Sequence, residues 1–173
     1  MRRENVSDLL AFLAVAREVG GDVVQAEKDY RDAIEFDPTF RMADQYAHML
    51  IRQGRFEEAL TVAQRLAGAN PSAESVLNLG VVQALTGHRR DAEANLARAR
   101  AMADDRWVSP YDFAALESAL GMRDDAVRHL REAINAGDFR MPFATVLLSP
   151  AFDALKDDPE FKTLIGSLRG SRS

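Results

Sequence analysis

The sequence predicts an all-α solenoid of four helix pairs followed by short C-terminal capping helices. A glycine recurs every 33 or 34 residues, and a small residue accompanies it on either side. No segment alternates with a period of two, so no strands are expected. The glycines are Gly21, Gly54, Gly87 and Gly121; the alanines five residues later are Ala26, Ala59, Ala92 and Ala126; the small residues seven residues earlier are Ala14, Ala47, Gly80 and Ala114.

A pair of crossing helices explains these three recurring positions. Glycine adopts the positive φ that ends a first helix at little steric cost. The small residues are expected where the two helices cross, because only Ala or Gly lets the backbones come close. Pro38 and Pro71 then end the second helices of the first two pairs.

Apolar residues within the predicted second helices follow helical spacing. In residues 22 to 36 they form one stripe, and residues 56 to 66 repeat it. The first stripe consists of Val23, Ala26, Tyr30, Ala33 and Ile34, and the second consists of Phe56, Ala59, Leu60, Ala63 and Leu66.

This pattern resembles the tetratricopeptide repeat, whose unit is about 34 residues long. The repeats cover about residues 7–39, 40–72, 73–106 and 107–138, so residues 1–138 form the repeat region. The first repeat carries Leu10, Leu13, Ala14, Gly21, Ala26, Tyr30, Ala33 and Pro38 at signature positions. The family's usual tyrosine in the first helix is absent, and Arg17, Leu50 and Gln83 take its place in the first three repeats.

Residues 139–173 are expected to form capping helices and a tail. The stretch SPAFDALKDDPEFKTLIGSL resembles the ends of bacterial tetratricopeptide arrays that are attached to signalling enzymes or transcription regulators. Apolar side chains on short helices there would cover the open end of the stack, which a repeat array needs for solubility. They are Phe152, Leu155, Phe161, Leu164, Ile165 and Leu168.

Residues 4–19 carry a second resemblance, to the first helix of LysR-type transcription regulators. In that family a helix-turn-helix follows at once, whereas here Gly20, Gly21 and Asp22 lead into a tetratricopeptide-like second helix. The recognition helix is therefore missing, and DNA binding is not carried over. We expect residues 4–19 to be the opening helix of the first repeat.

Composition excludes several classes of function. The net charge of −5 gives no general affinity for nucleic acid or an anionic membrane. The absence of cysteine excludes disulfides, thiol catalysis and thiolate metal sites. No apolar run is long enough to span a membrane, and we expect a soluble, cytoplasmic protein.

No motif indicates an enzyme, a metal site or a cofactor. His48, His88 and His129 lie in different repeats and lack a partner at metal-ligand spacing. We interpret the acidic pairs as groups that stabilise helix N-termini, where carboxylates are favoured. These pairs are Asp104–Asp105, Asp124–Asp125 and Asp157–Asp158.

The resemblance to tetratricopeptide repeats implies a concave groove lined by the first helices. Its mixed acidic and apolar character favours a peptide or helix with basic and aliphatic side chains. A carboxylate clamp is not expected, because Arg41 is accompanied by three acidic residues. The groove positions are Asp8, Ala11, Val15, Arg41, Asp44, His48, Glu74, Leu77, Val81, Val108, Tyr111 and Ala115; the open alternative is that they are simply residues of a scaffold whose partner binds elsewhere.

The first helix also carries a second apolar stripe, formed by Leu9, Phe12, Ala16 and Val19. Leu10, Leu13 and Ala14 are expected to face the second helix instead. At the positions that match Phe12, later repeats carry the polar residues Gln45, Asn78 and Asp112. Contiguous apolar surface usually marks an interface, so the stripe predicts a homodimer, unless residues 1–6 or the tail fold over it.

The sequence therefore predicts a non-catalytic scaffold that binds a protein or peptide in the groove. The first alternative is a regulatory or sensor region associated with a bacterial signalling enzyme or transcription regulator. The second is a small enzyme, which the lack of any convergent acid, base or nucleophile set disfavours.

Overall fold

The computed structural model describes residues 3–37, 44–103, 107–137 and 149–170, and the side chains of residues 3–5, 8 and 168–170 are not described. Throughout these ranges the secondary structure is helical, with no strand. The chain divides into two compact units, Met1–Pro71 and Ser72–Ser173.

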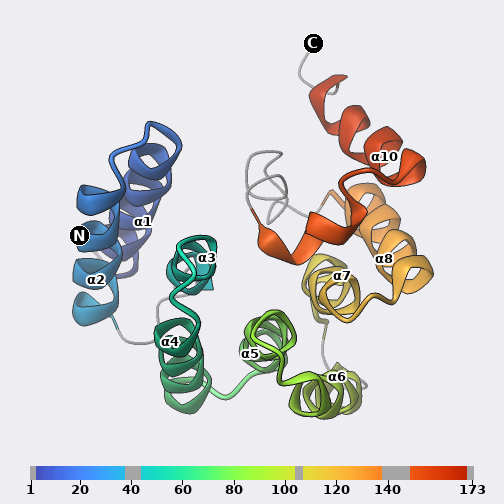
Figure 1. Cartoon of the computed structure of the whole chain (residues 1–173), viewed down its shortest axis with the longest axis horizontal. Helices are drawn as coiled ribbons and strands as arrows, with labels where there is room; N and C mark the ends of the chain where they lie inside the picture. The colour runs from blue at the N-terminus through green and yellow to red at the C-terminus, as the bar shows by residue number, and fades with distance from the viewer. Residues whose placement is uncertain (1–2, 38–43, 104–106, 138–148, 171–173) are drawn as a thin grey trace. The chain divides into compact units, whose positions relative to one another are not determined.

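The first unit contains two helix pairs (Figure 1). Helix α1 (Arg3–Val19) packs against α2 (Val23–Phe36), and α3 (Asp44–Arg52) packs against α4 (Phe56–Ala69). The Tyr30 and Tyr46 rings stack with centroids 5.8 Å apart and join α2 to α3. Helices α2 and α4 end before Pro38 and Pro71, as the prolines predict.

The second unit contains two further pairs and a C-terminal segment (Figure 1). Helix α5 (Ala73–Leu85) packs against α6 (Arg89–Ala103), and α7 (Pro110–Ala119) packs against α8 (Arg123–Asn135). The segment consists of the 3₁₀ helix η1 (Pro150–Leu155), which contacts α7 and α5, and helix α10 (Pro159–Gly170), which contacts α8.

All four pairs have the same turn between their helices. Each recurring glycine has a positive φ, between 73° and 88°. The amide after the glycine donates to the carbonyl five residues back, and the glycine amide donates to the carbonyl three residues back, which is a Schellman motif. The first bonds are Asp22 N to Arg17 O, Arg55 N to Leu50 O, His88 N to Gln83 O and Met122 N to Glu117 O, at 2.7–2.9 Å.

The small residues of the recurring pattern are buried. Ala14, Ala47 and Ala114 are fully buried, and so are the four alanines that follow the glycines. Gly80 shows why size matters at this position. A Cβ atom added there would lie only 2.7 Å from Cδ2 of Leu116, because the Leu116 side chain of α7 occupies the space beside the glycine.

Candidate interaction surfaces

The predicted groove residues of the second unit lie in its core. Leu77 is fully buried, and Val81, Tyr111 and Ala115 are also buried, within one apolar cluster that includes Phe152. The Tyr111 ring contacts the Phe152 ring, with centroids 5.8 Å apart. These positions are therefore enclosed within the unit, and the C-terminal segment contributes to this through η1, which packs against α7 and α5.

Other predicted groove positions are also partly or fully enclosed. Val108 and Ala11 are buried, and Val15, Asp44 and Glu74 are half-buried; Arg41 and the side chain of Asp8 lie outside the described residues. Asp44 belongs to the first unit and Glu74 to the second, so these two acidic residues are described separately. Peptide binding in a groove stays a prediction.

His48 is buried rather than exposed in a groove. Both ring nitrogens are enclosed and lack a hydrogen-bond partner. Burial lowers the pKa of His48 from 6.5 to about 3, and the nearby positive charge of Arg52 acts in the same direction. The imidazole is therefore neutral at neutral pH, and it belongs to the packing of the first unit.

The C-terminal segment is held by an aromatic anchor. Phe152 is fully buried between Tyr111 and Phe161, with 5.8 Å between the centroids of each pair of rings. Ser149 begins η1, and its hydroxyl accepts a hydrogen bond from the Ala151 amide. The predicted anchors Leu155 and Ile165 are also buried, whereas Leu164 is only half-buried.

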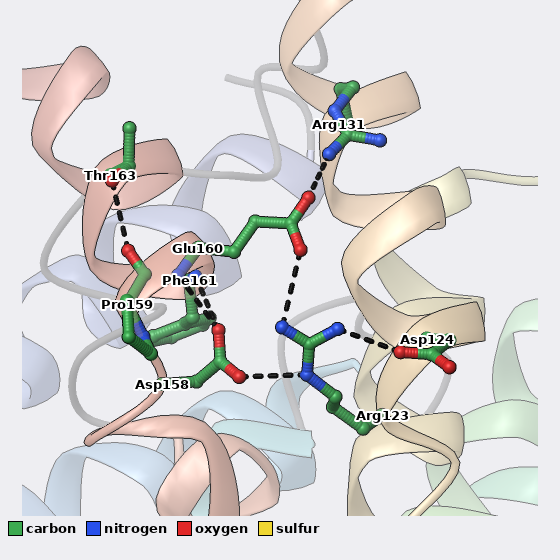
Figure 2. A network of polar contacts seen from close by, with 8 residues as sticks. All are labelled: Arg123, Asp124, Arg131, Asp158, Pro159, Glu160, Phe161 and Thr163. Atoms are coloured by element: carbon green, nitrogen blue, oxygen red, sulfur yellow. Dashed lines mark hydrogen bonds and ion pairs between the residues drawn. The ribbon is translucent and has the colours of Figure 1, made fainter.

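An ionic cluster joins the same segment to α8 (Figure 2). Arg123 donates from Nε to Asp158 at 2.8 Å and from Nη2 to Glu160 at 3.2 Å. Glu160 also pairs with Arg131. The hydrogen bond from Arg123 lowers the pKa of Asp158, so this carboxylate stays ionised to more acidic pH than an isolated one. We name Arg123, Arg131, Asp158 and Glu160 the α10 latch.

Asp158 also begins α10. Its carboxylate accepts hydrogen bonds from the amides of Glu160 and Phe161 at 2.9 and 3.0 Å (Figure 2). This bears out the capping interpretation for Asp158. Asp124 and Asp125 lie in the first turn of α8, as expected, while the pair at 104–105 lies outside the described residues.

Three of the four helix pairs contain a polar pair that was not predicted from sequence. In each of these pairs, the first residue is the one whose carbonyl accepts the hydrogen bond from the amide five residues later. Its side chain contacts the side chain of the residue twelve positions later. Arg17 pairs with Asp29, Asn95 Nδ2 donates to Gln83 Oε1 at 2.7 Å, and Glu117 contacts His129. The corresponding residues of the second pair are Leu50 and Val62, both apolar.

Glu117 is the most enclosed charge among these pairs. Its side chain is fully buried, with Nη2 of Arg100 at 3.0 Å and Nδ1 of His129 at 2.6 Å. Because a carboxylate only accepts hydrogen bonds, Nδ1 of His129 carries the hydrogen. The His129 ring also stacks on Phe113, with centroids 5.4 Å apart. Comparing residue types twelve positions apart in the four repeats would have revealed these pairs.

The stripe predicted on the first helix is exposed. Leu9 and Val19 each expose 63% of their surface and Phe12 exposes 59%, and Ala16 is exposed beside them. Leu13 was expected to face α2, but it is 40% exposed and extends this surface. We name Leu9, Phe12, Leu13, Ala16 and Val19 the α1 face. Gln45 and Asp112, which match Phe12 in later pairs, are buried.

The first unit also has a hollow of about 480 Å³ between α2, α3 and α4. It is lined by apolar side chains together with two arginines and one glutamate, so its surface is partly apolar and partly charged. Nε of Arg31 donates to the Tyr46 hydroxyl at 2.9 Å, which holds one of those arginines at the wall. The lining residues are Arg31, Ile34, Glu35, Tyr46, Val62, Arg65 and Leu66.

Among the described residues, no group of three or more His, Asp or Glu side chains is placed to hold a metal ion. None of the described helices combines the length and apolar character needed to cross a membrane. In comparisons with known proteins, no family model matches the chain, and no curated protein matches it significantly.

Proposed function

We propose that this chain is a non-catalytic protein-interaction module built from four tetratricopeptide-like repeats. The identical glycine turns and the buried small residues at corresponding positions support the repeat assignment. Repeat arrays of this kind offer extended surfaces for binding other proteins, and this function requires no set of catalytic residues.

The exposed α1 face is the observation that carries the proposal. Large apolar side chains gather there on one helix, whereas the matching polar residues Gln45 and Asp112 of later pairs are buried. A contiguous apolar surface of this kind usually marks a protein–protein interface. Val24, on the first turn of α2, is also exposed, at 84%.

The occupant we propose for the α1 face is a second copy of the chain. A two-fold interface places the same surface on both partners, so an uncharged apolar stripe is complementary to itself. The neighbouring charges do not oppose this pairing, because Arg17 pairs with Asp29 and Glu18 pairs with Arg52 inside the unit. Burying the α1 face therefore does not leave Arg17 or Glu18 without an oppositely charged partner.

The test compares Phe12→Glu with Phe56→Glu by sedimentation velocity over about 10–100 µM, where a modest apolar interface is populated. Phe56 is a matched control, because it is 47% exposed in the same unit but lies on α4. We expect the wild-type chain and Phe56→Glu to dimerise and Phe12→Glu to stay monomeric. A wild-type chain that is monomeric throughout this range contradicts the self-association proposal.

The alternative is a regulatory region that works with a bacterial signalling enzyme or transcription regulator. It is favoured by the C-terminal segment, which covers positions expected to be open. A segment that covers a binding surface is one way to regulate binding. The test is the genomic neighbourhood: an adjacent gene for such an enzyme or regulator is expected, and unrelated neighbours would speak against it.

A further inference from the structure

We propose that the face of α5 and α7 beneath Phe152 is a second interaction surface, on which residues 149–165 are an exchangeable occupant. The partner it fits is a segment of another protein with the chemistry of that occupant. Such a segment has Phe and Leu three residues apart, with acidic residues three and five positions after the Leu. This inference is independent of the α1 face.

The apolar part of the contact resembles a peptide held by an anchor in a pocket. Phe152 is fully buried against Tyr111, and Leu155, one turn later, is buried beside it. These two side chains come from a single short 3₁₀ helix, not from a helix pair. A large aromatic side chain in a fully desolvated pocket is the usual anchor of a binding segment.

The polar part sets the charge of the partner. Arg123 and Arg131 lie on α8, and Asp158 and Glu160 lie on the occupant (Figure 2). The side chains of Arg123, Arg131 and Glu160 are 40–48% exposed, so water and salt reach the α10 latch. Exposed ion pairs contribute little affinity but favour partners of the correct charge. A partner therefore needs acidic residues after its apolar anchor.

The connection to the same chain decides how strongly a partner must bind. An occupant tethered in the chain acts at an effective concentration on the order of millimolar. A free segment with the same contacts must compete with that concentration. Weakening the tethered occupant should therefore increase the apparent affinity for a free segment without changing the surface beneath.

The experiment uses full-length chains and a fluorescent peptide of residues 149–167. The latch variant carries Asp158→Arg and Glu160→Arg, so its own segment is repelled by Arg123 and Arg131. The control chain carries Asp153→Arg and Asp157→Arg, the same charge change at exposed positions outside the latch, where the two carboxylates pair with Lys156 and Lys162 of the same segment. We expect the peptide to bind the latch variant at least about tenfold more tightly than the control chain or the wild type.

Specificity and salt provide two further readouts. A peptide with Phe152→Ala should lose binding to the latch variant, and binding of the native peptide should weaken as salt rises. Equal peptide binding by all three chains, or no binding by a latch variant with unchanged helicity, would overturn the proposal. If labelled wild-type chain binds the latch variant as well as the peptide does, the surface belongs to a second copy rather than to another protein.

A measurement on the wild-type chain remains decisive if the latch variant does not fold. Hydrogen exchange is followed for amides of residues 150–165 and of α7 while NaCl is raised. We expect the segment to exchange faster with salt while α7 stays protected, because an exchangeable occupant opens locally. Simultaneous exchange of both would show that the segment is an inseparable part of the unit, and the proposal would fail.

Discussion

The buried imidazole of His48 predicts that acid destabilises the first unit. Its pKa falls from 6.5 to about 3 on folding because burial disfavours the charged form, and no hydrogen-bond partner compensates. The unfolded chain therefore binds the proton more strongly than the folded chain. The stability contributed by a neutral His48 is fully present above pH 6.5 and decreases as pH falls toward 3.

The magnitude follows from the pKa difference. At pH 5 the unfolded imidazole is almost fully protonated and the folded one almost fully neutral. Each pKa unit corresponds to about 1.4 kcal/mol, and pH 5 lies about 1.5 units below the unfolded pKa. The first unit should therefore lose roughly 2 kcal/mol of unfolding free energy between pH 8 and pH 5 through this group alone.

The assay is urea unfolding at pH 8 and pH 5, followed by circular dichroism, with hydrogen exchange of α3 to report on the first unit. His48→Leu removes the titrating group, and His88→Leu is the control because His88 is exposed. We expect the acid-induced loss to shrink by about 2 kcal/mol in His48→Leu and to remain in His88→Leu. An equal loss in all three chains, or an NMR titration of His48 near pH 6.5, would refute the reasoning.

Three further predictions follow from the packing of the second unit. Gly80→Ala should lower the unfolding free energy, measured by urea titration, by about 1–3 kcal/mol, because its Cβ would strike Cδ2 of the fully buried Leu116. Gly68→Ala, with open space around it, should be neutral or stabilising by up to about 1 kcal/mol in the same titration. Glu117→Gln should lower the free energy of thermal unfolding by about 1–3 kcal/mol, because it replaces the buried charge facing Arg100 and His129. Glu132→Gln, on the exposed side of α8, should change this free energy by less than about 0.5 kcal/mol. Equal melting temperatures for the two variants would contradict the role of Glu117. Deletion of residues 139–173 should expose apolar core and reduce cooperativity and solubility, and a truncated chain that melts like the full one would show that the segment is an appendage.

The helix pairs could be predicted from sequence because their signals are local. Gly121 ends α7 with a φ of 77°, a conformation that glycine adopts without the cost imposed by a Cβ atom. Ala126, five residues later, is fully buried, as the recurring spacing indicates. The exposed Phe12 was also readable, because its apolar character differs from the polar residues at the matching positions.

The surfaces were decided only by tertiary structure. Tyr111 has the sequence position of a groove residue, but Phe152, about 40 residues later in the chain, buries it. Helical periodicity cannot tell which distant segment will cover a face, because burial depends on contacts between residues far apart in sequence. The same reason explains Glu117. Its place in the repeat was visible, but its burial between Arg100 and His129 depends on how α6, α7 and α8 pack together.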